Sequence, residues 1–306
     1  VYTGSGDDQI HYNMHDFYLE EPAQIPLDLS ALKTPMEDSL QAIWLGKVDN
    51  DGFNKLVRSA SLTHRQALIL RVYSKYLRQL GSSYSELYMQ DTLTQYGDIS
   101  KLLAELFEVK FAINDDKKTD RKKAAEKNIS KIKNLLSNVD SLDQDRILRS
   151  CLNVIECSLR TNFYQKDANG DHKNYISIKI QSSGVDEAPK PRPYAEIFVY
   201  SARFEGVHLR FGPVARGGLR WSDRKEDYRT EVLGLVKAQQ VKNTVIVPVG
   251  AKGGFVPKQM PANPTREQFL EEGIACYKSF ISGLLDITDN LKDGDVIPPL
   301  EVVRQD

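Results

Sequence analysis

Two basic side chains in the second half of the chain stand directly before glycines, where they could bind an anion. Arg216 precedes Gly217 and Gly218 in "GPVARGGLRWSD", and Lys252 precedes Gly253 in "VGAKGGF". A glycine lets a ligand approach the backbone N–H groups closely, and a cation beside such amides is a receptor for a carboxylate or a phosphate. The pattern therefore predicts an anion site, with Lys252 as the residue best placed for chemistry.

A third cation, Lys242, ends a stretch that is predicted to be helical. Each of the three also has an ordinary interpretation: Lys252 as a surface turn residue, Arg216 as an ion-pair partner, and Lys242 as the positive complement of a helix C-terminus. No nucleotide-binding loop explains them, because neither GxxxxGK[ST] nor GxGxxG occurs in the chain. The residues alone leave these alternatives open.

The elements that must position these cations follow from the patterning. Residues 223–241 are predicted to form a helix, with Asp223 as N-cap and Glu226 completing a capping box. "TVIVPV", residues 244–249, is predicted to be a buried strand that leads into a glycine turn holding Lys252. The buried stripe of the helix is expected to consist of Tyr228, Val232, Leu235 and Val236.

The remainder of the chain divides by its periodicity. Apolar residues recur at three- and four-residue steps through 35–112 and 141–163, which predicts helices. Alternating stretches and one long helical stretch then follow, with strands expected at 175–180, 196–201 and 206–212 and a helix at 265–288. The predicted fold class is α/β (α+β overall), with a helical region at 1–165 and an α/β substrate-binding domain with a mixed sheet at 166–306.

Composition excludes several classes of function. The net charge is −1, and acidic residues interrupt the Lys-rich stretch 115–134, so no nucleic-acid partner is expected. The chain contains no run of about 18 apolar residues, so no membrane span is predicted. No signal peptide is evident either, so we expect a cytoplasmic protein. Three cysteines form no CxxC pair, so no metal site is predicted and Cys151 and Cys157 are expected to be small core residues.

Two long stretches resemble the large NAD-specific glutamate dehydrogenases of bacteria: "EGVHLRFGPVARGGLRWSDRKEDYRTEVLGLVKAQQVKNTVIVPVGAKGGF" and "DGFNKLVRSASLTHRQALILRVYSKYLRQL". The resemblance, which also includes "GIACYKSFISGLLDITDN", covers nearly the whole chain. It implies that L-glutamate, water and NAD give 2-oxoglutarate, ammonia and NADH. The first residue is not Met and both ends look cut. We therefore expect a fragment whose Rossmann domain and catalytic Asp lie past Asp306, and which does not turn over alone.

The resemblance also assigns roles by motif. Lys242 of "VKN" matches the lysine that binds the α-carboxylate, and Lys252 of "PVGAKGG" matches the catalytic lysine. Arg216 stands where smaller glutamate dehydrogenases have a lysine that binds the side-chain carboxylate, and Arg can hold a carboxylate bidentately. Gly217, Gly218 and Gly253 would line the approach of the substrate. Two neighbouring cations would favour the neutral amine of Lys252, the form that accepts a proton.

Two further expectations accompany this assignment. The helical half holds more apolar helices than one small bundle needs, so some are expected to face another subunit of a homo-oligomer. The alternative to the enzyme is a carboxylate- or anion-binding module, regulatory or structural, without chemistry of its own.

Overall fold

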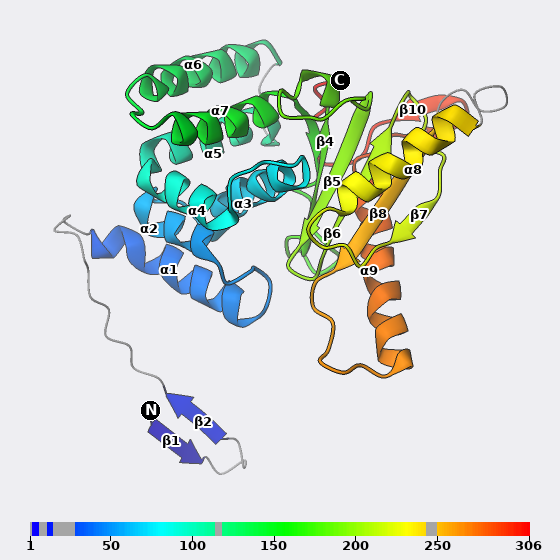
Figure 1. Cartoon of the computed structure of the whole chain (residues 1–306). Helices are drawn as coiled ribbons and strands as arrows, with labels where there is room; N and C mark the ends of the chain where they lie inside the picture. The colour runs from blue at the N-terminus through cyan, green and yellow to red at the C-terminus, as the bar shows by residue number, and fades with distance from the viewer. Residues whose placement is uncertain (1, 6–10, 15–27, 114–117, 243–249) are drawn as a thin grey trace.

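A helical region and a six-stranded sheet make up most of the structure, a computed structural model that describes residues 2–5, 11–14, 28–113, 118–242 and 250–306. The helices precede the sheet in the chain and pack against one of its faces (Figure 1). The first part consists of a short hairpin, β1 (Tyr2–Ser5) with β2 (His11–Met14), followed by α1 (Leu29–Trp44), η1 (Gly52–Lys55), α2 (Leu56–Ser59), α3 (His64–Gln79), α4 (Glu86–Gln95), α5 (Gly97–Phe111), α6 (Lys118–Leu136) and α7 (Leu142–Glu156).

The helix α3 illustrates why the predicted helices form. Thr63 accepts a hydrogen bond from the Gln66 backbone N–H, and the Gln66 side chain accepts one from Thr63, which is a capping box. Behind that cap, apolar residues recur every three or four positions, and most of them are buried against α5, α7 and the sheet. The predicted helical region at 35–112 is thus confirmed.

The sheet is mixed, as predicted. Its strand order is β3-β4-β5-β6-β8-β7, and every neighbouring pair is antiparallel except β7 with β8, which are parallel. Two helices and a small hairpin complete this part. Its elements are β3 (Ser158–Thr161), β4 (Tyr175–Ile180), β5 (Ala195–Ser201), β6 (Phe204–Arg210), β7 (Leu219–Trp221), α8 (Tyr228–Lys242), β8 (Ala251–Pro257), α9 (Arg266–Asp286), β9 (Asn290–Lys292) and β10 (Asp295–Ile297), together with the short η2 (Ser182–Gly184).

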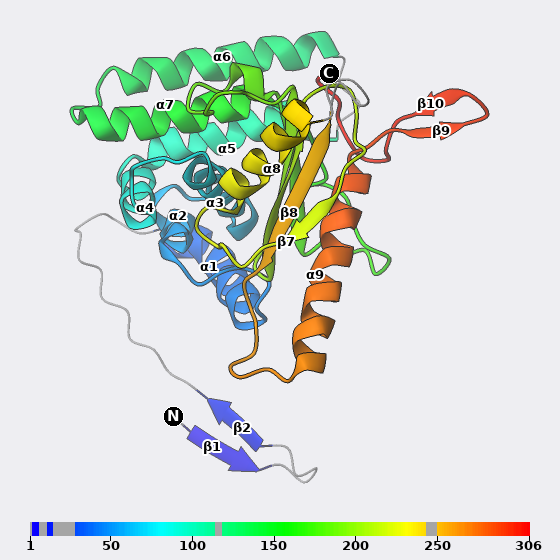
Figure 2. The same cartoon turned by 45° about the vertical axis from the view of Figure 1, so that its right-hand side comes forward.

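Alternation along the strands gives the sheet two different faces. On β5, Phe198 and Tyr200 belong to the large core that the helical region and α8 share, whereas Ile197 and Val199 belong to a smaller core under α9. Helix α8 and the helical region therefore cover one face of the sheet, and α9 covers the other (Figure 2).

Two predicted helix boundaries are wrong. The helix expected at 141–163 ends at Glu156, and β3 follows it, because residues 158–161 pair with the edge of β4. The helix expected from Asp223 begins at Tyr228. The backbone of Ser222 still donates to Phe255 of β8, and Arg224 turns back to pair with Asp227, so the chain leaves the sheet edge before it can wind into a helix.

Other expectations have mixed outcomes. Cys151 is a buried core residue as predicted, whereas Cys157 is only half-buried. In α8, Tyr228, Val232 and Val236 are buried as predicted, but Leu235 is 40% exposed. The strand predicted at 244–249 lies outside the described residues. Within the described part, none of the helices combines the length and the apolar character that crossing a membrane would require.

Candidate functional site

Lys252 lies within strand β8, so the predicted glycine turn around it is wrong. It is paired with Leu209 of β6, and residues that face each other across an antiparallel pair point to the same side of the sheet. Leu209 belongs to the core that α8 covers. The half-buried Lys252 side chain therefore lies on the α8 side of the sheet.

The glycines after Lys252 are needed for close packing. A Cβ on Gly253 would lie 2.4 Å from Cδ2 of Leu219 and 2.9 Å from Cδ2 of His208, and a Cβ on Gly254 would lie 2.6 Å from Cγ2 of Val232. These glycines let β7 and α8 approach β8 more closely than any side chain would allow. Their role in the strand is thus steric, which is why a turn was the wrong inference from the composition.

The segment that contains Gly217 and Gly218 lies directly against this strand. A Cβ on Gly217 would fall 1.5 Å from the carbonyl oxygen of Ala251, and the Gly253 N–H donates to the carbonyl of Gly218 at 3.2 Å. A Cβ on Gly218 would lie 3.3 Å from Nζ of Lys252. The structure therefore brings together the two glycine motifs, 34 residues apart in sequence, with the Lys252 amine beside the first of them.

An open hollow of about 370 Å³ lies at this junction. It is lined by Gly218, Leu219, Arg220, Trp221, Leu235, Lys252 and Gly253. Arg220 is ion-paired with Glu231, which also accepts a hydrogen bond from Ser222 at 2.5 Å. Lys252, in contrast, has no ion-pair partner among the described residues. An unpaired cation in a recess with glycine backbone at its wall is suited to hold a carboxylate.

The other two predicted cations, Arg216 and Lys242, are not among the described residues that line the hollow. Arg216 is exposed beside Gly217. Lys242 is the last residue of α8, and its side chain is not described. Val232 packs on Gly254 and Leu235 shares the hollow with Lys252, so α8 runs opposite to β8. Its C-terminal end therefore lies toward the end of β8 that carries Lys252, although ten residues separate the two lysines in sequence.

Three residues near the site were missed by the sequence analysis. His208 is buried across the sheet from Gly253, and burial together with the charge of Arg210 lowers the pKa of His208 to about 4. Trp221 stacks on Phe269 of α9 at 4.7 Å between ring centroids, and Arg220 is held by Glu231. Arg220 and Trp221 directly follow the first glycine motif and could have been noted there, whereas nothing in the sequence marks His208.

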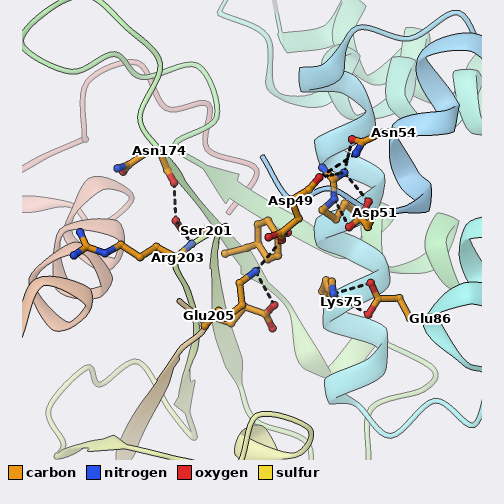
Figure 3. Close-up of polar contacts among 12 residues, drawn as sticks. Asp49, Asp51, Asn54, Lys75, Glu86, Asn174, Ser201, Arg203 and Glu205 are labelled. Atoms are coloured by element: carbon orange, nitrogen blue, oxygen red, sulfur yellow. Dashed lines mark hydrogen bonds and ion pairs between the residues drawn. The ribbon is translucent and has the colours of Figure 1, made fainter. Parts of the chain in front are cut away.

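A network of charges ties the strand that carries Lys252 to the helical region. Lys258, just after β8, contacts Asp49 at 2.9 Å and Glu205 at 3.3 Å, and Tyr200 donates to the same Asp49 carboxylate. Figure 3 shows Asp49 and Glu205 within this network, with the Lys75–Glu86 pair nearby. Burial alone would raise the pKa of Asp49, but Lys258 and Tyr200 hold it below its usual value.

A second buried network fixes the start of α8. Arg229 and Glu196 are both fully buried, and Nε of Arg229 donates to Oε2 of Glu196 at 2.8 Å. Tyr76 and Ser182 donate to the other carboxylate oxygen. Gln79 of α3 donates to the carbonyls of residues 225 and 226 and accepts from the Arg229 N–H at 3.3 Å. The helical region thus sets the position of α8.

The chain is similar to known glutamate dehydrogenases. Residues 131–306 match the family model of the bacterial NAD-glutamate dehydrogenase catalytic domain, and residues 48–113 match that of glutamate dehydrogenase helical motif 3. The chain is 50% identical to an NAD-specific glutamate dehydrogenase of Halomonas elongata, 49% to one of Pseudomonas aeruginosa and 46% to one of Mycobacterium tuberculosis, in each case over 96% of its length.

It spans only 18–19% of the length of those three relatives. The match to the catalytic-domain model nevertheless includes the whole sheet and the hollow beside Lys252. The chain belongs to the bacterial NAD-glutamate dehydrogenase family.

Proposed function

We propose that the protein to which this chain belongs oxidises L-glutamate to 2-oxoglutarate and ammonia with NAD, and that the hollow beside Lys252 is where the amino acid binds. Lys252 is the proposed catalytic residue. Arg216, Gly217, Gly218, Lys242 and Gly253 are the proposed substrate-binding residues. The observation that carries the proposal is the position of the Lys252 amine, which lies against Gly218 and has no ion-pair partner among the described residues.

The reaction requires cations for two carboxylates, room for the substrate against the backbone, and a group that accepts a proton. Glutamate carries two carboxylates, so its site needs cations at two places, and Arg216 and Lys242 are the candidates. The glycine backbone at 217–218 supplies a wall without side chains, against which a planar carboxylate can rest. Lys252 is the group proposed to accept the proton that the attacking water loses.

The described residues do not themselves fit NAD. Their parallel βαβ unit, β7–α8–β8, would be the natural place for a pyrophosphate. The connection into α8 carries no glycine, and its cations Arg224 and Lys225 are outnumbered by Asp223, Glu226 and Asp227, with Arg224 already paired to Asp227. It therefore offers a pyrophosphate neither glycine backbone nor a net positive charge. We therefore assign no part of NAD to this hollow and derive no step through it.

Three coarser proposals accompany the reaction. The division at residues 165 and 166 separates a helical region from the glutamate-binding part. The protein assembles as a homo-oligomer, which would explain apolar side chains left on the surface. We also propose that it works in the cytoplasm.

The test uses the whole protein and follows NADH formation from L-glutamate at 340 nm. Lys252→Ala is expected to lower kcat by roughly 10²-fold or more, as is typical when a positioned acid–base group is lost. Lys237→Ala, which removes an exposed lysine of α8, is the matched control and should leave the rate unchanged.

Two results would contradict the proposal. Equal activity in the Lys252→Ala variant would make Lys252 an ordinary strand residue. A folded parent protein that binds 2-oxoglutarate but shows no glutamate-dependent NADH formation would favour the anion-binding module instead.

A further inference from the structure

One side of α9 carries an apolar stripe that described residues cover only in part, since Tyr277 lies beside Phe255 and Ile281 packs at the edge of the core under α9. Leu270, Ile274, Tyr277 and Leu285 are 44%, 51%, 44% and 64% exposed, and Ile281 is half-buried. Their spacing of four, three, four and four places all five on one side of the helix. The side that faces the sheet is separate and consists of Gly273, Cys276, Phe280, Gly283 and Leu284.

This stripe differs from the scattered apolar residues of an ordinary surface. Single exposed leucines are common, but five in a line along a helix form a seam of the kind that receives another helix. Trp221 and Phe269 stack against each other beside it, so the neighbouring surface is held rigidly.

Two charges border the stripe on the same flank. Glu271 and Lys278 are both exposed, and neither has an ion-pair partner among the described residues. They are seven residues apart, which is two turns or about 10 Å of helix, too far for them to pair with each other. The midpoint between them falls between Ile274 and Ala275, in the apolar stripe.

We propose that α9 pairs antiparallel with α9 of a second copy of this chain, about a two-fold axis between Ile274 and Ala275. Each Glu271 then faces Lys278 of the other copy, and the pair forms twice. Each Leu270 enters the space between Tyr277 and Ile281 of the facing helix, and the two Ile274 side chains meet at the axis. An isologous contact of this kind needs one surface that complements itself, and this face does.

The charges select this register over another that the apolar residues alone would accept. An axis three residues farther on, between Tyr277 and Lys278, would set Leu270 against Leu285 and Ile274 against Ile281. It would also place the two Lys278 side chains against each other, and like charges in facing positions are destabilising. Only the first register turns both charges of the flank into attractive pairs.

The inference specifies the surface for the homo-oligomer proposed above, and it does not depend on the reaction. Loss of glutamate oxidation would leave it standing, and loss of the helix pair would leave the site at Lys252 standing. The experiment therefore measures contact between two copies of the chain and does not measure activity.

The experiment is disulfide cross-linking of single-cysteine substitutions in the whole protein under mild oxidation with diamide. Ile274→Cys is expected to give a covalent dimer on a denaturing, non-reducing gel, because the two positions are about 1.5 Å apart along the axis. Leu285→Cys is the matched control. It is more exposed, but its two copies would lie about 32 Å apart along the axis, so it should not cross-link. The unsubstituted protein gives the baseline for the native cysteines.

Charge reversal in the Ile274→Cys background then tests the register. Lys278→Glu should lower the yield of the cross-linked dimer at least several-fold, and adding Glu271→Lys should restore it. Equal cross-linking at positions 274 and 285 would show random collision and overturn the proposal. So would cross-linking by Tyr277→Cys in place of Ile274→Cys, or no dimer from Ile274→Cys in a protein that is folded by circular dichroism, which would mean that something else covers α9.

Discussion

Replacing Glu196 with Gln should destabilise the protein far more than the loss of one ordinary ion pair. The substitution keeps the shape of the side chain but removes its charge. Arg229, fully buried, then keeps its positive charge without a counter-ion. Burial, the largest cause that raises the pKa of Tyr76 well above its usual value, persists in the variant, so Tyr76 stays a neutral hydrogen-bond donor and cannot replace the lost charge.

The magnitude follows from the burial of both partners. Breaking a buried pair by removing one member typically costs about 3–5 kcal/mol, because an uncompensated charge is left in a medium of low dielectric constant. A domain has only about 5–15 kcal/mol of stability in total. The double replacement Glu196→Gln/Arg229→Met removes both charges and should recover much of the loss, so the two changes are expected to be strongly non-additive.

The assay is urea unfolding followed by circular dichroism. The matched control is Asp145→Asn, which breaks the Asp145–Arg149 pair at the surface of α7, whose side chains are 20% and 50% exposed, and should cost no more than about 1 kcal/mol. If Glu196→Gln shifts the midpoint no further than this control does, or if the double variant is less stable than the single one, the role given to the buried pair is wrong.

The remaining predictions concern the sheet around Lys252. Because the pKa of His208 is lowered to about 4 in the folded protein and is about 6.5 when unfolded, the unfolded chain binds more protons between these values. Stability should therefore fall by up to roughly 3 kcal/mol as pH drops from 6.5 to 4, and His208→Phe should flatten that slope in urea titrations at several pH values. Gly217→Ala should lower both the melting temperature and any affinity for a carboxylate, because its Cβ would collide with the carbonyl of Ala251. The control is Gly234→Ala in α8, where nothing lies within 4 Å of the added Cβ, and it should be neutral or stabilising by up to about 1 kcal/mol. Equal effects of the two substitutions would contradict the steric argument. Arg220→Ala should weaken binding of 2-oxoglutarate by less than Lys252→Ala does, measured by calorimetry, because Glu231 already neutralises Arg220.

The repeat of apolar residues was sufficient to predict the helices and strands in which local preference and tertiary packing agree. The helices between 35 and 112, the long helix at 265–288 and the strands at 175–180 and 196–201 are all present. In each of them the repeat of apolar residues matches the geometry of the element, so local preference and tertiary packing agree. The mixed character of the sheet was also predicted, and the structure confirms it.

The predictions of secondary structure failed where a segment distant in sequence but adjacent in space overrode the local preference of the residues. The stretch after Glu156 has a helical repeat, but β4 offers it a sheet edge, and it becomes β3. Glycines at 253 and 254 suggested a turn, since glycine is the usual turn residue. They lie in a strand because Leu219, His208 and Val232 occupy the space that side chains would need.

The order and type of most elements, the two glycine motifs and the cations beside them could be predicted from the chain alone, because they depend on residue type and spacing. The contact of Gly217 and Gly218 with Lys252 could not be predicted in this way. Neither could the neutralisation of Arg220 by Glu231, nor the absence of an ion-pair partner for Lys252 among the described residues. Such facts depend on strand register and on the placement of α8. Both are fixed by contacts between residues far apart in sequence, above all the buried Glu196–Arg229 pair, and no local pattern records them.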